Sequence, residues 1–177
     1  MSLFERTCAG DAAAFEQLYR DYHPRLARFL ARMLRRAQTI EEVLNDTMMV
    51  VWQKGDSFSG GSKLSTWIFG IAYRKALGAR SRQDEPVPDS DRDHRLSLDP
   101  SPEEESAQAR RQMLLRSAIA ELSLEHRTVL DLTYNHEMGY NEIASIMRCP
   151  VGTVKTRAMH ARRHLKNRLS GELADWI

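Results

Sequence analysis

The chain has 177 residues, of which 42% are hydrophobic, with 26 Lys and Arg against 24 Asp and Glu. That length suits one medium domain or two small ones. No apolar run is long enough to span a membrane, and the amino terminus lacks a charged-then-apolar signal pattern. Cys8 and Cys149 have no metal-binding spacing, so we expect two reduced thiols. These features exclude membrane-spanning and disulfide-rich classes and predict a cytoplasmic protein.

The charge is divided into three blocks along the chain. Residues 1–82 carry 13 Lys and Arg against 8 Asp and Glu, and residues 106–177 carry 11 against 7. Residues 83–105 carry 2 against 9, together with four of the six prolines. A stretch with so little apolar surface cannot offset its ordering entropy, which predicts a flexible linker. Helical periodicity on either side predicts an all-α protein with two small domains, 1–82 and 106–177.

The first domain has the pattern of a helical bundle. Asp11 is expected to cap a helix whose core face includes Phe15 and Leu18. The pair His23-Pro24 is expected to break or kink this helix before a second one over residues 26–34.

A third helix is expected to begin at Thr39-Ile40-Glu41-Glu42. This run fits a capping box, with Thr39 as N-cap and Glu42 reaching back, and Gly55 is expected to end the helix. A polar loop, Asp56 to Lys63, then leads to a last helix from Leu64, with Trp67 predicted to lie in the core.

The second domain contains a predicted helix-turn-helix. Tyr140, Ile143, Ala144 and Met147 share one helical face, and Pro150 is well placed to open the next helix. That helix has a buried stripe opposite a face of cations without any acid, whereas a solvated amphipathic helix usually mixes both signs. A packed scaffold helix before an exposed basic helix is what major-groove binding requires. The cations of this helix are Lys155, Arg157, Arg162, Arg163, Lys166 and Arg168.

The stretch LSLEHRTVLDLTYNHEMGYNEIASIMRCPVGTVKTRAMHARRHL, Leu122 to Leu165, resembles region four of bacterial sigma factors. Many other regulators carry a similar EIA…VGTVK motif. The segments AFEQLYRDYHPRLARFLARML, IEEVLNDTMMVVWQ and FSGGSKLSTWIFGIAYRKALGARSR resemble region two of the extracytoplasmic-function sigma factors. The family has glycine where Arg148 stands, and a left-handed residue there would cost about 1 kcal/mol relative to glycine.

The resemblance implies two DNA-binding surfaces. In the second domain, residues facing the groove of the minus-thirty-five element would be Thr153, Lys155, Thr156, Arg157 and His160. Arg162, Arg163 and Lys166 would instead contact phosphates. In the first domain, the minus-ten strand would be held by Ser59, Gly60, Gly61, Ser62 and Lys63, with Arg74, Lys75 and Arg80 behind them. The alternative for this loop is a plain surface loop before a capped helix.

The resemblance also implies binding to core RNA polymerase, at the β′ clamp coiled coil and the β flap. The clamp contact would use Glu41, Glu42, Asn45 and Asp46, although acids near a helix start also occur simply to complement the helix dipole. The family supplies an acid where Thr39 stands. Phosphorylation of Thr39, or less favourably of Thr47, would add that charge and switch the protein on. The alternative is an exchange between two interchangeable N-caps.

No motif of an enzyme active site is present. His160 and His164 lie four residues apart but lack a third ligand, so we expect no metal and no cofactor. The predicted function is a sigma factor that directs RNA polymerase to promoters and helps to melt them, with an anti-sigma factor or a Ser/Thr kinase as further partners. Two alternatives stay open: a helix-turn-helix regulator acting without polymerase, and a helical enzyme.

Overall fold

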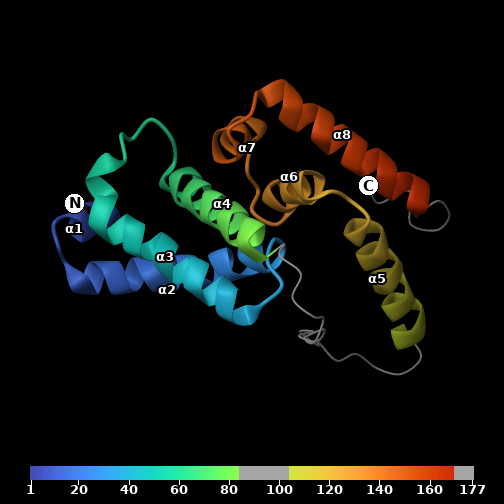
Figure 1. The fold of residues 1–177 in the computed structure, drawn as a ribbon, viewed down its shortest axis with the longest axis horizontal. Helices are drawn as coiled ribbons and strands as arrows, with labels where there is room; N and C mark the ends of the chain where they lie inside the picture. The colour runs from blue at the N-terminus through green and yellow to red at the C-terminus, as the bar shows by residue number, and fades with distance from the viewer. Residues whose placement is uncertain (84–103, 170–177) are drawn as a thin grey trace.

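The computed structural model describes residues 1–83 and 104–169, and their regular structure is entirely helical, which confirms the all-α prediction (Figure 1). The elements in chain order are α1 (Leu3–Cys8), α2 (Ala12–Ala31), α3 (Ala37–Lys54), the 3-10 turn η1 (Gly55–Ser57), α4 (Leu64–Gln83), α5 (Glu104–Ala120), α6 (Leu124–Tyr134), α7 (Tyr140–Met147) and α8 (Val151–Arg168). Most of the predicted linker, residues 84–103, lies outside the described residues. We call α1–α4 the amino-terminal helices and α5–α8 the carboxy-terminal helices.

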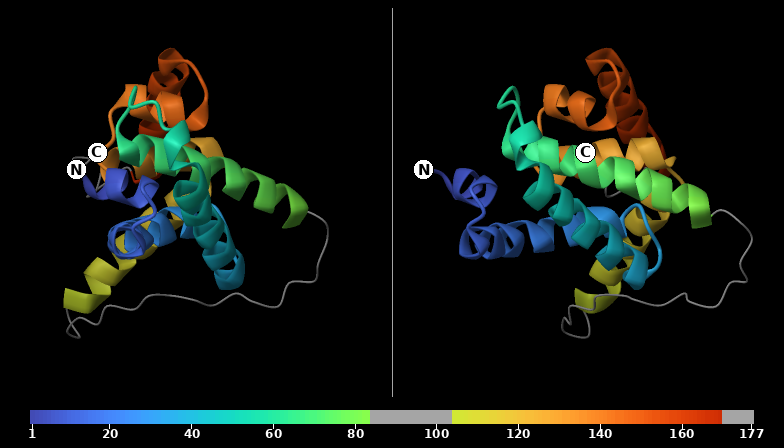
Figure 2. Two further views of the ribbon diagram at one scale, coloured as in Figure 1. Left: turned by 90° about the vertical axis from the view of Figure 1, so that its left-hand side faces the viewer. Right: turned by 60° about the vertical axis from the view of Figure 1, so that its left-hand side comes forward.

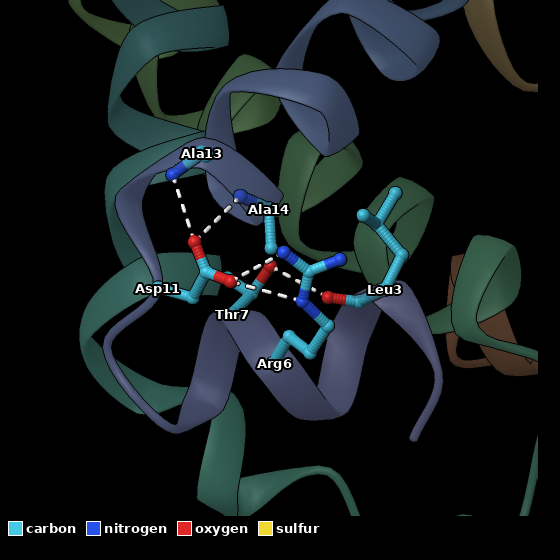
Figure 3. Close-up of polar contacts among 6 residues, drawn as sticks. All are labelled: Leu3, Arg6, Thr7, Asp11, Ala13 and Ala14. Atoms are coloured by element: carbon cyan, nitrogen blue, oxygen red, sulfur yellow. Dashed lines mark hydrogen bonds and ion pairs between the residues drawn. The ribbon is translucent and has the colours of Figure 1, made fainter.

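The start of the chain forms a helix that the sequence analysis did not predict. Ser2 and Glu5 make a capping box: the Glu5 amide donates to Ser2 Oγ at 3.2 Å, and the Ser2 amide donates to Glu5 Oε2 at 2.7 Å. Asp11 caps α2 as predicted, because its Oδ1 accepts from the amides of Ala13 at 3.0 Å and Ala14 at 3.1 Å (Figure 3). The Ser-x-x-Glu spacing at Ser2 is a signal from which α1 could have been predicted.

The predicted break at Pro24 is wrong, because α2 is one helix of 20 residues that runs through it. Pro24 is exposed, while Leu18, Leu26 and Phe29 keep one buried face on both sides of it. Burial of this continuous face outweighs the cost of about 3 kcal/mol that an interior proline imposes. The predicted second helix therefore does not exist as a separate element.

The predicted capping box at Thr39 is also wrong. α3 begins at Ala37 after an extended Arg36, whose side chain makes no cap hydrogen bond, so Thr39 is the third helical residue. The Oε1 atom of Glu42 accepts from Gln38 Nε2 at 3.0 Å. Alanine and glutamine are better helix formers than threonine, and they carry the helix start two residues upstream.

The helix-turn-helix is confirmed as α7 and α8. α7 is followed by its C-cap Arg148 with φ 51° and ψ 50°, the left-handed conformation in which glycine would be the less strained residue. The Cys149 amide closes the turn by donating to the Ala144 carbonyl at 3.1 Å. Pro150 precedes the first residue of α8, one position before the predicted place.

The amino-terminal and carboxy-terminal helices share one hydrophobic core, which the prediction of two tethered domains did not include. α7 packs on one side of α4, with α3 and α2 on the other (Figures 1 and 2). His136, whose side chain is 3% exposed, lies edge-on to Phe29 and Phe69 with ring centroids 5.9 and 4.8 Å away. The buried Asp131 lies 3.7 Å from Arg32 across the same contact. We call this contact the interdomain seam.

Candidate nucleic-acid interface

The outer face of α8 is a basic surface. Val154, Ala158, Ala161 and Leu165 are buried, and the residues on the opposite side of the helix are exposed because of the 3.6-residue period. The exposed residues of this face are Lys155, Thr156, Met159, His160, Arg163 and Lys166. The face thus combines cations for phosphates with shorter polar and apolar side chains for base edges.

Three of the predicted α8 contacts lie to the sides of this face. Thr153 is half-buried, and the half-buried Arg157 has its Nη1 3.9 Å from Cys149 Sγ. Arg162 donates to the hydroxyls of Tyr134 at 3.5 Å and Tyr140 at 3.3 Å, and these bonds raise its pKa. The face itself is completed by Met159, which is 50% exposed.

The sequence analysis did not predict Met159, because cations and hydroxyls were the expected DNA contacts. Its spacing of four residues from both Lys155 and Arg163 places it on their face, and that spacing could have identified it.

The predicted minus-ten loop is exposed from Ser59 to Lys63. Gly60 has φ +73°, and nothing lies within 4 Å of where its Cβ would be, so glycine is required there by conformation rather than by space. Ser59, Gly61 and Ser62 are open to solvent around it. The loop has the exposure that strand capture needs, and no aromatic side chain stands within it.

The structure does not gather the predicted minus-ten cations of α4 beside that loop. Lys75 pairs with Asp46 of α3 at 3.2 Å, and Arg74 is half-buried, which lowers its pKa, with Arg148 adding to the effect. Arg80 lies 16 residues beyond Leu64, about 24 Å along the helix at about 1.5 Å per residue. Trp67 packs against Phe4 and Phe58 with ring centroids 6.0 and 5.4 Å away, but it is half-buried at the edge of the core rather than inside it as predicted.

Glu142 of α7 joins the base of the loop to the carboxy-terminal helices. Its carboxylate accepts from the Gly139 amide at 3.0 Å, from Thr66 Oγ1 at 3.1 Å and from Lys63 Nζ at 3.3 Å. The bond from Gly139 is the main reason that the pKa of Glu142 is lowered, and Lys63 and Thr66 add to it. Lys63, which was predicted to contact the minus-ten DNA strand, is therefore bound by the carboxy-terminal helices in this structure, which we call the closed form.

The predicted polymerase-binding residues form one exposed face of α3, which we call the α3 face. Glu41, Glu42, Asn45 and Asp46 are all exposed. Tyr19 donates to Asn45 Oδ1 at 2.8 Å, and His23 Nε2 lies 3.4 Å from Glu41 Oε2. Bonds to neighbouring helices thus fix the orientation of this face.

An apolar residue also belongs to the α3 face. Met49 follows Asn45 by one turn and is 50% exposed. The acidic motif did not point to it, although its helical spacing from Asn45 would have.

The two predicted phosphorylation sites differ in accessibility. Thr47 is fully buried, and its hydroxyl donates to the Val43 carbonyl at 2.7 Å, so a kinase cannot reach it in the folded protein and that prediction is wrong. Thr39 is half-buried in the first turn of α3.

No group of three or more His, Cys, Asp or Glu among residues 1–83 and 104–169 is arranged to hold a metal ion. Over the same residues, none of the helices combines the length and apolarity needed to cross a bilayer.

Comparison with known proteins places this arrangement in a class: helical proteins with a helix-turn-helix that initiate transcription. Residues 18–85 match the family described as Sigma-70 region 2, and residues 112–165 match Sigma-70, region 4. The RNA polymerase sigma-H factor of Pseudomonas aeruginosa is 31% identical over 94% of this chain and 92% of its own length. The ECF RNA polymerase sigma-E factor of Haemophilus influenzae is 28% identical over 95% and 94%.

A solved structure agrees with these sequence matches. The Bartonella quintana sigma factor RpoE, in complex with the anti-sigma factor NepR, superposes with a TM-score of 0.66 at 25% identity, covering 89% of this chain and 98% of that one. The chain belongs to the sigma-70 family and is a sigma factor of the extracytoplasmic-function type. It is a transcription initiation factor and not an enzyme.

Proposed function

We propose that this sigma factor joins core RNA polymerase through the α3 face and carries it to promoters with two DNA elements. The observation that carries the proposal is the presence of both family regions in one chain, each with an exposed surface of fitting chemistry. The outer face of α8 takes the minus-thirty-five duplex, with Lys155 and Thr156 toward base edges, His160 at the edge of the groove, and Arg163 and Lys166 toward phosphates. The loop from Ser59 to Lys63 takes the melted minus-ten strand.

Promoter binding requires the seam to open. Elements about 25 base pairs apart are separated by about 85 Å on straight duplex at about 3.4 Å per base pair. α4 and α7 are in direct contact in the closed form, so the loop and α8 cannot reach both elements at once. Opening frees Lys63 from Glu142 at the same time as it separates the two surfaces. The closed form is therefore the resting state, and polymerase selects the open one.

We also propose that an anti-sigma factor binds this protein, because the Bartonella sigma factor, which has a similar fold, is bound to one. Such a partner acts by favouring the closed form or by covering the α3 face. Both routes work in the cytoplasm, where the polymerase is.

We further propose that phosphorylation of Thr39 switches the protein on. In the first turn of α3 a phosphate would sit near the positive end of the helix dipole and beside Glu42, adding about −1.5 to −2 charge to the α3 face. The competing explanation is that Thr39 is simply a neutral residue that the start of a helix tolerates in place of the acid. Core binding and transcription by Thr39→Glu, Thr39→Ala and wild type decide between them: a switch requires Thr39→Glu to exceed the other two.

The test of the main proposal is reconstitution with purified core polymerase. The protein should co-elute with core and support run-off transcription from a promoter that core alone does not use. A regulator that acts without polymerase would instead bind duplex as a dimer and leave core unbound. That result would overturn the proposal.

A further inference from the structure

An open pocket of about 450 Å³ lies between the α5–α6 junction and the second half of α8. Its volume falls within the range of small-ligand sites. α8 contributes His160, Arg163, His164 and Asn167 to it, so the pocket borders the exposed face of that helix. The other side is formed by Glu121, Leu122, Ser123 and His126. Three histidines from two helices therefore meet in one cavity.

His126 and His160 face each other across the pocket with parallel rings. Their centroids are 6.4 Å apart and their planes differ by 6°. The Nδ1 atom of His126 lies 2.7 Å from Ser123 Oγ, while its Nε2 has no hydrogen bond to the described part of the chain. Burial is the main reason that the pKa of His126 is lowered, and the charges of His160 and Arg157 lower it further. If both rings were protonated they would repel each other unless an anion lay between them.

The acids near the pocket are already engaged. Glu121 of the α5–α6 junction accepts from Arg168 Nε at 2.7 Å and lies 3.3 Å from His164 Nε2. Glu125 of α6 is bonded to its own backbone amide and to Ser123, which lowers its pKa.

The charged and titratable groups around the two rings come from three elements. Glu121 of the junction and Arg163 and His164 of α8 line the pocket, Glu125 of α6 and Arg157 of α8 act on His126 from beside it, and Arg168 of α8 pairs with Glu121. Three guanidiniums thus stand against two carboxylates, before any imidazole is protonated. The pocket has an excess of cations and offers donors to an anion.

The position of the pocket identifies which anion it takes. His160 lies one turn beyond Thr156 on the exposed face, so α8 in a major groove brings the pocket to the sugar–phosphate backbone at the groove edge. Arg163 supplies a fixed charge there, and imidazolium supplies donors whose charge depends on pH.

We propose that this pocket is a proton-linked phosphate site, in which His126, His160 and Arg163 bind one phosphodiester of promoter DNA and the imidazoles take up protons as they do so. The site rests on the proposed role of α8 in DNA binding and adds a dependence on pH to it. The negative charge of the bound phosphate favours the protonated form of His126, whose pKa is lowered in the free protein mainly by burial. DNA affinity is therefore greatest below the pKa of the free protein and is lost as pH rises through the higher pKa of the complex.

The test measures binding of the full chain to a labelled 20-base-pair duplex of arbitrary sequence, because a phosphate contact does not depend on sequence. Anisotropy titrations at low salt from about pH 5 to about pH 8 cover the histidine range. Wild type should lose about tenfold in affinity over that range for each unit by which DNA raises one imidazole pKa. His126→Asn, which can still bond Ser123, and His160→Gln should each flatten this dependence.

Two controls isolate the site. His23→Asn removes a histidine from α2, far along the chain from the pocket, and should keep the full pH dependence. Lys166→Gln removes a fixed α8 charge and should weaken binding equally at every pH. Histidine resonances titrated in parallel with duplex and with inorganic phosphate distinguish DNA from a free anion.

Each result decides the question. Equal pH dependence in His126→Asn, His160→Gln and wild type overturns the site, as does duplex binding that does not vary with pH. Imidazole shifts caused by inorganic phosphate but not by duplex overturn the assignment to DNA. No duplex binding by wild type at any pH overturns this site together with the role proposed for α8.

Discussion

Two glycines of α4 allow the interdomain seam to be perturbed with an internal control. A Cβ added at Gly70 would lie 3.2 Å from Arg74 Nη1 and 3.8 Å from the Ile146 Cα of α7. A Cβ added at Gly78 would meet nothing within 4 Å. Both positions are interior to the same helix, so replacing either glycine gains about 0.5–1 kcal/mol of helix stability.

Gly70→Leu should open the seam, whereas Gly78→Leu should leave it closed. Overpacking at a filled contact costs about 1–3 kcal/mol, and at Gly70 the bulk is forced between α4 and α7. At about 1.4 kcal/mol for each factor of ten, the closed-to-open ratio should fall by about 5-fold to about 150-fold. Because polymerase selects the open form, Gly70→Leu should also bind core at least as tightly as wild type.

The assay is the distance between spin labels at Gln53→Cys of α3 and Ser145→Cys of α7, with Cys8 and Cys149 replaced by Ser. Gly70→Leu should show a second, longer distance that Gly78→Leu lacks. Identical distance distributions in the two variants would refute the reasoning about the seam. A longer distance in both would show that α4 itself, rather than the contact at Gly70, had changed.

Three further predictions concern the surfaces and the seam. Asp46→Lys should weaken core binding about tenfold or more while the protein stays folded, with Asp56→Lys outside the α3 face as control; unchanged affinity in a folded Asp46→Lys variant would exclude the docking role. Lys155→Ala should reduce run-off transcription by the equivalent of about 1–3 kcal/mol without reducing core binding. The same test applies to Arg157→Ala. Equal amounts of transcript from Lys155→Ala and wild type would show that Lys155 is not part of the DNA interface. Lys63 and Thr66 lower the pKa of Glu142 across the seam, in addition to the larger effect of the Gly139 amide at the start of α7, so the stabilisation that these two contacts give the closed form is present at neutral pH and lost as pH falls through the lowered pKa. Spin-label distances should therefore show acid opening in wild type and a pH-independent seam in Glu142→Gln; acid opening that persists in Glu142→Gln would assign it to another group.

The features that sequence analysis predicted well depend on local rules. The buried stripe of α8 follows from the 3.6-residue period, and Asp11 caps α2 because a carboxylate satisfies free amides at any helix start. The left-handed Arg148 was predictable from the family glycine alone. These residues have the same role whatever the remainder of the chain does.

The errors arise where packing or competing local preferences decide. Pro24 stays inside a helix because the buried face on both sides of it is held by α3 and α4, which no window around residue 24 contains. The N-cap of α3 is the extended Arg36, whereas the capping-box pattern from Thr39 to Glu42 predicted Thr39. Thr47 was correctly placed on the apolar side, but only the fold shows that its hydroxyl is completely buried.

The interdomain seam could not be predicted from the sequence. In the sequence, His136 is indistinguishable from an ordinary polar residue of a turn. Its burial between Phe29 and Phe69 depends on two helices more than 60 residues away in the chain. Gly70 lies against the Ile146 Cα of α7, a contact that no pattern within α4 indicates. Likewise, the pairing of His126 with His160 depends on how α6 packs on α8.

The central claim is that this chain gives promoter specificity to RNA polymerase. The most direct measurement is in vitro transcription of fragmented genomic DNA from the source organism by core polymerase, with and without the purified protein, followed by mapping of transcript starts. The account predicts new starts only in the presence of the protein, each preceded by the same two sequence blocks at minus ten and minus thirty-five. Identical starts with and without the protein, under conditions in which core is active, would contradict it.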